Sequence, residues 1–183
     1  MRLHQHISGW VMGLSLAAAL PATTLVKLSV DEMVAQSTDI VRGRVSNCEA
    51  AQRGATIYTA CVVRVSERLK GGPATTLAIS IPGGVLRGAG GRRVRQMIAG
   101  APALSEKQDY LLFLWTGRTG VTQLIGLSQG ALEIQLSGGQ AVAQRAPMAE
   151  AGFQNARGEE VTDGGVSVSL ESIRQRVRKL EAR

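Results

Sequence analysis

Four arginines lie close together in a glycine-rich part of the chain. They are Arg87, Arg92, Arg93 and Arg95, and five of the nine residues over 83–91 are glycine. A guanidinium group binds a carboxylate or phosphate through two parallel hydrogen bonds. Glycine gives the backbone more conformational freedom than any other residue. We therefore predict a mobile basic loop that contacts an anion or a partner, the alternative being a solvated connection between strands. The segment lacks the G-x-x-x-x-G-K-[ST] and G-x-G-x-x-G orders of nucleotide-binding loops.

Two groups of carboxylates and a few lysines are the residues with the potential for hydrolytic chemistry. Paired carboxylates act as general acid and base, and a Ser/Lys dyad can supply a nucleophile. One carboxylate group has the pattern of a helix cap and the other of a polar loop, and no S-x-x-K motif occurs. We expect no catalytic residues and keep a hydrolase as the alternative. The residues concerned are Asp31 with Glu32, Glu159 with Glu160 and Asp163, and Lys27, Lys70, Lys107 and Lys179.

The first 22 residues have the pattern of a secretory signal peptide. Arg2 precedes an uncharged, mostly apolar run over residues 7–20. This run is too short to span a bilayer, and no later stretch is long and apolar enough to do so. Cleavage after Ala22 or after Ala19 would fit, and residues 23–183 would then form a periplasmic or secreted protein without a transmembrane segment.

Removal of the signal peptide also removes both histidines, His4 and His6. Histidine is the commonest metal ligand and general base, so we expect neither a metal nor a cofactor. The exported chain loses Arg2 and no carboxylate, and its formal charge falls from +7 to +6. A basic protein of this kind meets acidic proteins, lipid headgroups, cell-wall polymers or nucleic acid. Nucleic acid fits least well, because few aromatic side chains remain for base stacking.

Cys48 and Cys61 form a disulfide in our interpretation, since they flank a turn at residues 52–55 in an exported chain. A zinc or redox site is not expected, because there are two sulfur ligands, no histidine and no C-x-x-C motif. The apolar alternation opposes direct pairing, since it sets odd positions of one strand against even positions of the next. A β-bulge at Gly43 or Asn47 would restore the register.

Capping residues predict one helix near each end of the exported chain. Ser29 and Glu32 have the spacing of a capping box ahead of a short helix that ends near Gln36. Ser169 caps a second, amphipathic helix over residues 169–182.

Apolar periodicity predicts strands for most of the remainder. Residues 110–115 are a continuous apolar run and form the expected central strand, with Trp115 in the core, whereas residues 147–165 are expected to be an irregular loop. Seven or eight short antiparallel strands with two peripheral helices predict a mostly β fold, a small OB-like β-barrel in a single domain over residues 23–183. The further strands are expected over residues 39–48, 57–69, 76–81, 94–98, 121–127, 131–136 and 141–145.

Several short motifs follow one another in a recognisable order. They are D-I-V-R-G-R-V at residues 39–45, Y-T at 58–59, L-K-G at 69–71, G-A-P at 100–102, Y-L-L-F-L at 110–114 and G-L-S-Q-G at 126–130. The first three resemble the opening strands of netrin-like domains, the OB-type barrels shared with tissue inhibitors of metalloproteinases. The whole series resembles a group of uncharacterised exported bacterial proteins.

The resemblance implies a barrel that binds partners and has no catalytic apparatus of its own. The inhibitor branch acts through an N-terminal cysteine that chelates the target's zinc, whereas no cysteine precedes Cys48 here, so no inhibitory residue is assigned. We expect an exported, non-catalytic binding protein whose partner is an acidic protein or an exported peptidase. The alternatives are an accessory protein or inhibitor of such a peptidase, and a hydrolase.

Overall fold

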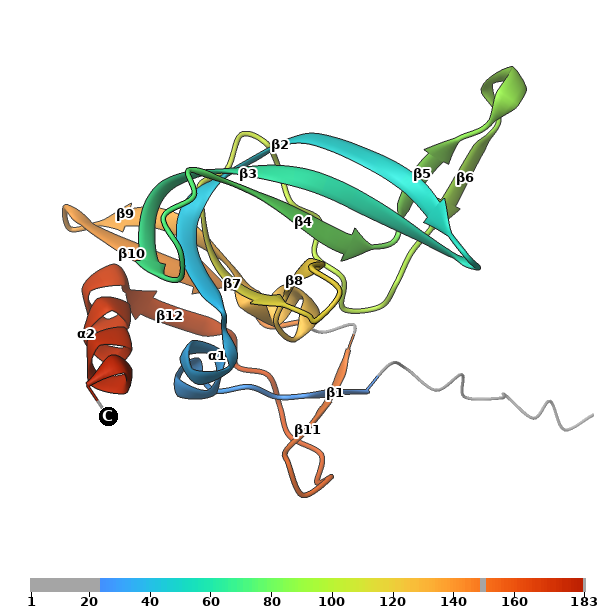
Figure 1. The fold of residues 1–183 in the computed structure, drawn as a ribbon. Coiled ribbons are helices and arrows are strands. Elements are labelled where there is room, and N and C mark those ends of the chain that lie inside the picture. The colour runs from blue at the N-terminus through green and yellow to red at the C-terminus, as the bar shows by residue number, and fades with distance from the viewer. Residues whose placement is uncertain (1–23, 149–150, 183) are drawn as a thin grey trace, which may run out of the picture.

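The structure, a computed structural model, describes residues 24–148 and 151–182 (Figure 1). The predicted signal peptide, residues 1–22, lies outside the described residues. Within the described ranges, no helix is both long enough and apolar enough to cross a membrane.

An antiparallel sheet of eight strands forms most of the fold. Seven strands follow the order β12-β10-β9-β7-β2-β3-β4, and β8 pairs with the end of β7. The predicted mostly β class is confirmed, although the strand pairing among the described residues does not close into a barrel. The strands are β2 (Asp39–Arg53), β3 (Thr56–Lys70), β4 (Thr76–Pro82), β7 (Tyr110–Thr116), β8 (Thr122–Leu124), β9 (Ala131–Ser137), β10 (Gln140–Arg145) and β12 (Val166–Ser169).

Two helices and two small sheets complete the fold. The helices α1 and α2 contact each other beside the sheet. Strand β1 pairs in parallel with β11, and β5 pairs antiparallel with β6. The elements are β1 (Thr24–Val26), α1 (Val30–Gln36), β5 (Gly84–Arg87), the 3-10 turn η1 (Ala89–Gly91), β6 (Arg93–Gln96), the 3-10 turn η2 (Leu127–Gly130), β11 (Gly152–Gln154) and α2 (Leu170–Glu181).

Both helices begin at the predicted caps. The Ser29 hydroxyl accepts a hydrogen bond from the Glu32 N–H at 3.2 Å, and the Glu32 carboxylate accepts one from the Ser29 N–H at 2.8 Å. The bond from the Ser29 N–H, followed by a bond that the Ser29 hydroxyl donates to the Glu32 carboxylate at 2.7 Å, lowers the pKa of Glu32. The Ser169 hydroxyl accepts a hydrogen bond from the Ser172 N–H at 3.2 Å. Local hydrogen bonding therefore starts each helix where the sequence predicts it.

The central strand β7 buries two separate apolar clusters, one on each face. Leu111 and Phe113 pack against the cluster that contains residues of α1 and α2, whereas Leu112 and Leu114 pack against residues of β2, β3 and β4. The prediction of a central strand is confirmed. The placement of Trp115 in the core is wrong, because its side chain lies near the end of β7, beyond both clusters, and is 48% exposed.

A disulfide joins Cys48 in β2 to Cys61 in β3. The strand register shifts between Ser46 and Glu49, so that Asn47 and Cys48 together oppose Cys61. Asn47 has a positive φ of 51°, as the extra residue of a bulge can. The predicted disulfide is confirmed. The register shifts at both positions considered for the bulge, since it also shifts between Arg42 and Gly43.

Two segments expected to be loops contain strands. Residues 83–91, expected to be mobile, contain β5 and the tip of a β-hairpin whose second strand is β6. Gly90 and Gly91 at this tip have φ values of 71° and 78°. These two glycines allow the chain to reverse direction at the tip, because glycine adopts a positive φ at little energetic cost. Residues 147–165 contain β11, which pairs with the distant strand β1. Short strands of this kind depend on their partner and leave little local signal.

Candidate functional site

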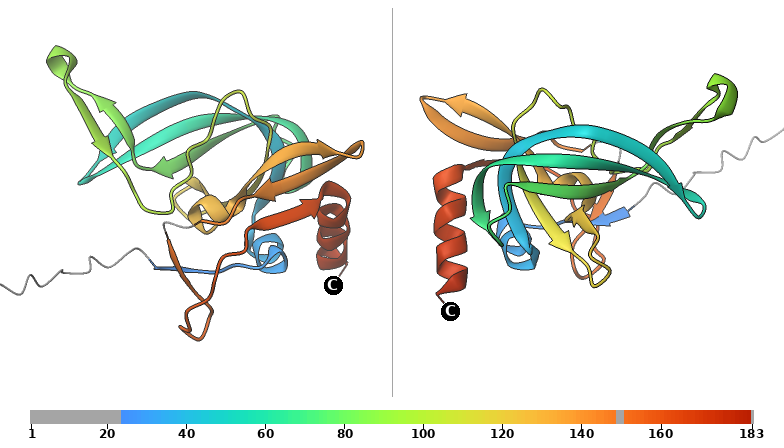
Figure 2. Two further views of the ribbon diagram at one scale, coloured as in Figure 1. Left: turned by 180° about the vertical axis from the view of Figure 1, so that it is seen from behind. Right: turned by 45° about the horizontal axis from the view of Figure 1, so that its top comes forward.

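The four arginines predicted to contact a partner all lie on the β5–β6 hairpin, which projects away from the large sheet (Figures 1 and 2). Arg87 ends β5, Arg92 follows the tip, and Arg93 and Arg95 belong to β6. We call these four residues the hairpin arginines. The structure therefore brings together all residues of the predicted contact site.

The hairpin places three of these arginines on one face. Arg87 pairs with Arg93, and Val85 pairs with Arg95. Directly paired residues of an antiparallel ladder share a face, as do alternate residues of one strand. Arg87, Arg93 and Arg95 therefore share a face with Val85. Like charges directly opposite each other destabilise a ladder, and a bound anion would relieve this repulsion.

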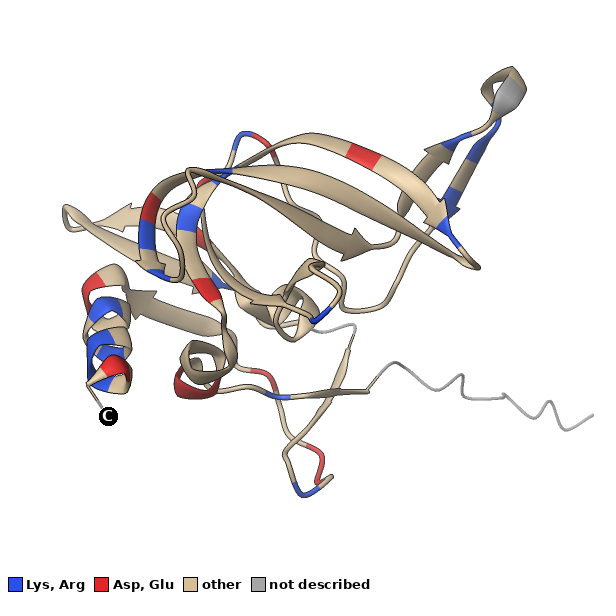
Figure 3. Ribbon diagram, viewed as in Figure 1, with Lys and Arg blue, Asp and Glu red and all other residues tan. Residues whose placement is uncertain are grey.

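The hairpin arginines are exposed, and none of them forms an ion pair with any described carboxylate. Other arginines do pair: Arg68 lies 2.6 Å from Asp39, and Arg42 lies 2.7 Å from Asp109. Figure 3 shows basic residues on both strands of the hairpin and no acidic residue there. The hairpin is thus a cationic arm whose guanidinium groups have no carboxylate partner among residues 24–148 and 151–182.

Three hydrogen bonds attach the base of the hairpin to β3. The Ile57 N–H donates to Gln96 Oε1 at 2.5 Å, the Gly83 N–H donates to the Ile57 carbonyl at 2.7 Å, and the Thr59 hydroxyl donates to the Gly83 carbonyl at 2.8 Å. Gly84 has a φ of 138°, and a Cβ at this position would lie 2.2 Å from Thr59 Oγ1. The arm therefore needs glycine at its base and leaves the sheet in a defined direction.

A groove of about 630 Å³ lies at the foot of the hairpin. Arg95 lines it together with apolar side chains that include Val85, Met97 and Leu104, and the Cys48–Cys61 disulfide. Val85 is 40% exposed and Met97 is 79% exposed. Exposed apolar side chains beside a cation suit a peptide segment that carries both apolar and acidic residues.

The carboxylates considered for catalysis take part in local contacts. Asp31 pairs with Arg176 of α2, and Glu32 belongs to the capping box of α1. Glu159 accepts a hydrogen bond from Asn155 Nδ2 at 2.5 Å. In the part of the chain that the structure describes, no three His, Cys, Asp or Glu side chains gather as a metal site would require.

Two of the lysines considered for a Ser/Lys dyad hold the N-terminal region in place. Lys27 Nζ donates to the Thr162 carbonyl and Lys70 Nζ to the Val34 carbonyl, both at 2.8 Å. Their recorded bonds are therefore to backbone oxygens and not to a serine hydroxyl.

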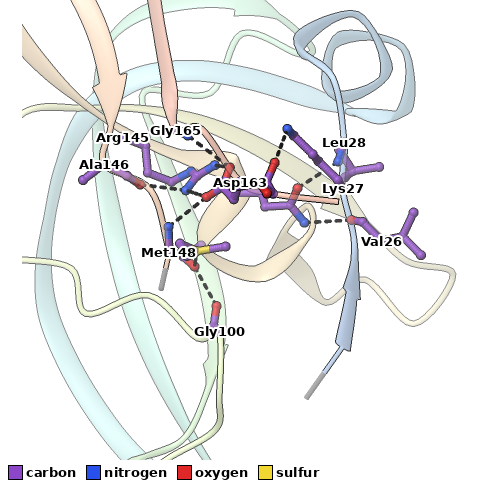
Figure 4. A network of polar contacts seen from close by, with 12 residues as sticks. Val26, Lys27, Leu28, Gly100, Arg145, Ala146, Met148, Asp163 and Gly165 are labelled. Atoms are coloured by element: carbon purple, nitrogen blue, oxygen red, sulfur yellow. Dashed lines mark hydrogen bonds and ion pairs between the residues drawn. The ribbon is translucent and has the colours of Figure 1, made fainter. Parts of the chain in front are cut away.

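Asp163 forms a buried ion pair that the sequence did not reveal (Figure 4). Arg145 donates to its two carboxylate oxygens at 2.7 and 3.0 Å, and the backbone N–H groups of Met148 and Gly165 also donate to it. The hydrogen bonds from Arg145, together with these N–H groups, outweigh burial and lower the pKa of Asp163 to about 2. The available signal was the Asp-Gly-Gly sequence, because aspartate before glycine commonly bonds the backbone of a turn.

A second groove, of about 650 Å³, also escaped prediction. It is lined by Trp115 and Tyr58 together with Arg53 and Arg118. The sequence signal is Trp115 at the end of the apolar run, two residues before the turn at residues 117–120, where β7 ends.

Comparisons of the chain with protein-family models, with curated proteins and with solved structures found no match. We therefore infer function from the charge and geometry of the two surfaces.

Proposed function

We propose that the chain is an exported, non-catalytic binding protein whose β5–β6 hairpin and adjoining groove bind an acidic segment of a partner protein. The observation that carries this proposal is the set of exposed hairpin arginines, which have no carboxylate partner among the described residues, on an anchored arm. Arginine binds carboxylates with two parallel hydrogen bonds. Burial of Val85 and Met97 in the complex would add apolar contact.

An extended peptide fits this surface better than a compact one. Strand β6 has β5 as its one ladder partner among the described residues, so its outer edge offers free backbone groups. A peptide can pair with such an edge as an additional strand. Its acidic side chains would then face the hairpin arginines, and an apolar side chain would enter the groove.

Export is part of the same proposal. It is supported by the signal peptide predicted over residues 1–22. The Cys48–Cys61 disulfide agrees with it, because disulfides persist in the periplasm and outside the cell.

We also infer that five strands form a partly open OB-like barrel. β7, β2, β3 and β4 pair in succession, β8 pairs back onto β7, and β4 lies beside β8. The apolar cluster that contains Val45, Val63, Ile79 and Leu112 would then fill the interior. An experimental structure in which β4 and β8 are separated by far more than the roughly 5 Å of neighbouring strands would contradict this inference.

The test of function is a titration with a labelled peptide of Glu-Ser-Leu-Ser repeats, in which glutamate and leucine share one face of an extended strand. Affinity capture from the host's exported fraction follows. We expect a variant with all four hairpin arginines replaced by glutamine to lose at least tenfold in affinity for the peptide. The wild-type affinity should fall as salt is raised, because exposed ionic contacts are screened.

A matched control removes four positive charges elsewhere. Arg44, Arg64, Lys107 and Arg157 are exposed and lie outside the hairpin, and their replacement by glutamine should leave peptide affinity within about twofold. Equal losses of peptide affinity in both variants would mean that net charge alone causes the effect. Undiminished peptide binding by the hairpin variant would refute the proposal. Capture of a peptidase would support the accessory or inhibitor role, which its activity with and without this protein would distinguish.

A further inference from the structure

The second groove is lined by residues of β2, β3, β4, β7 and β8 and of the β7–β8 turn, and none of the hairpin arginines lines it. Tyr58 lies in β3 and Ser80 in β4, where the neighbours of Ser80, Ile79 and Ile81, belong to an apolar cluster. Because side chains alternate along a strand, Ser80 points out of that cluster into the groove. Arg53 at the end of β2, Trp115 of β7 and its partner Gln123 of β8 complete the strand contribution.

Trp115 presents a flat aromatic surface that the β7–β8 turn holds in place. A Cβ at Gly117 would lie 2.9 Å from Cη2 of Trp115, so the backbone of the turn lies against the indole ring. The turn is closed by hydrogen bonds from the Gly117 N–H to the Val121 carbonyl at 3.0 Å and from the Gly120 N–H to the Gly117 carbonyl at 2.9 Å. About half of the tryptophan remains exposed. Burying this apolar surface under a ligand would be favourable.

The polar side chains of the groove are free to bind a ligand. Tyr58, Ser80, Gln123, Arg53 and Arg118 make no side-chain hydrogen bond or ion pair that the structure records among its described residues, and no carboxylate lines the groove. Ser80 lines the groove and is only 8% exposed. The site therefore offers an aromatic platform, neutral hydrogen-bonding groups and two cations.

We propose that this groove binds an acidic oligosaccharide, a short chain of sugar rings that carry carboxylates. The apolar C–H face of one ring would stack on Trp115, and its hydroxyl groups would bond to Ser80 and Gln123. A sugar carboxylate would pair with Arg53 or Arg118. The volume of the groove lies within the range of small-ligand sites.

Single-stranded nucleic acid is the less favoured ligand. It binds through a series of aromatic side chains and a basic groove that follows many phosphates, whereas this groove has Trp115, Tyr58 and two arginines. The neutral hydrogen-bonding groups fit the hydroxyls of a sugar. This proposal uses a different surface from the hairpin, so it does not depend on the function proposed above.

The probe is trigalacturonate, compared with neutral maltotriose and with an eight-residue oligothymidylate. In a Trp10→Phe background Trp115 is the single tryptophan of the chain, and its fluorescence reports binding directly. We expect a saturable change with trigalacturonate and at least tenfold weaker binding of maltotriose and of the oligothymidylate. Calorimetry should show at least a tenfold loss for W115A and for R53Q/R118Q, with the loss in R53Q/R118Q confined to the acidic sugar.

The control R44Q/R64Q removes the same charge from exposed positions of β2 and β3 outside the groove, and it should bind as the wild type does. Replacement of the hairpin arginines should also leave trigalacturonate binding unchanged. If the melting curve of W115A shows that it does not fold, the proposal is tested by calorimetry of W115F and R53Q/R118Q instead. Absence of saturable trigalacturonate binding, undiminished binding by folded variants, or tighter binding of the oligothymidylate would overturn the proposal.

Discussion

At the scale of single residues, Asp163 carries a negative charge in a place that is almost closed to water. Its side chain is 2% exposed, and Arg145 donates to both of its oxygens. The pKa is about 2 in the folded chain, against an ordinary 3.8. Because the folded pKa is the lower one, the ionised group stabilises the fold above about pH 4, and this contribution is lost as the pH falls towards 2. The shift corresponds to about 2 kcal/mol.

We therefore expect D163N to lower the free energy of unfolding at pH 7 by about 2–4 kcal/mol, since Arg145 would be left buried without its partner. Urea unfolding at pH 7, 4 and 2.5 measures this change. The wild type should lose stability between pH 4 and 2.5 more steeply than the variant. The control D109N breaks the more exposed pair with Arg42 and should cost less. An equally steep loss of stability in D163N between pH 4 and 2.5 would show that another group causes the pH dependence.

At the scale of elements, the direction of the basic arm depends on the backbone at its base. Gly84 combines a φ of 138° with close contact to Thr59, whereas Gly88 has a φ of −86° and room for a Cβ. A side chain is therefore excluded at the first position and tolerated at the second. The two glycines belong to the same hairpin and form a matched pair for testing.

We expect G84A to destabilise the fold by about 1–3 kcal/mol, because alanine meets both strain and steric conflict there. G88A should change stability by less than about 0.5 kcal/mol and should keep peptide binding. Urea unfolding and the labelled acidic peptide measure the two effects. Equal stability of G84A and G88A would mean that the hairpin base is not held as described.

At the scale of the whole molecule, one sheet separates two apolar clusters. Ile40 and Val41 of β2 face opposite clusters, as do Leu111 and Leu112 of β7. Loss of packing in one cluster should therefore destabilise the other cluster as well. This arrangement predicts a single cooperative unfolding transition, as is usual for a domain of this size.

Ile173 of α2 is fully buried in the cluster under the helices, and we expect I173A to cost about 2–5 kcal/mol. In the Trp10→Phe background, the transitions followed by Trp115 fluorescence and by circular dichroism should shift together. A shift in the dichroism alone would show that α2 and its cluster unfold separately from the β7–β8 end. I173V, which keeps most of the side-chain volume, should shift both transitions by about 1 kcal/mol.

The features that the sequence predicts well all depend on residues close together in the chain. The caps at Ser29 and Ser169 join residues three positions apart. The continuous apolar run of β7 lies within a few residues, and the bulge beside Cys48 follows from the period of two that any strand imposes. The clustering of the hairpin arginines can be predicted from the sequence because they are close together in the chain.

Other features arise where distant segments meet. The Gln129 side chain bonds to the backbone of Val26 and Leu28, more than 100 residues away, and β11 exists as a strand through its pairing with β1. The side chains around Trp115 come from four strands. No local pattern encodes such contacts, because they form only once the chain has closed the long loops between them.

The sequence by itself therefore determined the mostly β class, the two helices, the disulfide and the presence of a basic segment. The tertiary structure decided that this segment is an anchored arm beside a groove, that Asp163 is an internal ion-pair partner, and that Trp115 forms part of a surface instead of the core. The physical reason is that propensity, capping and alternation act over a few residues, whereas burial and electrostatic environment depend on every segment that packs around a side chain.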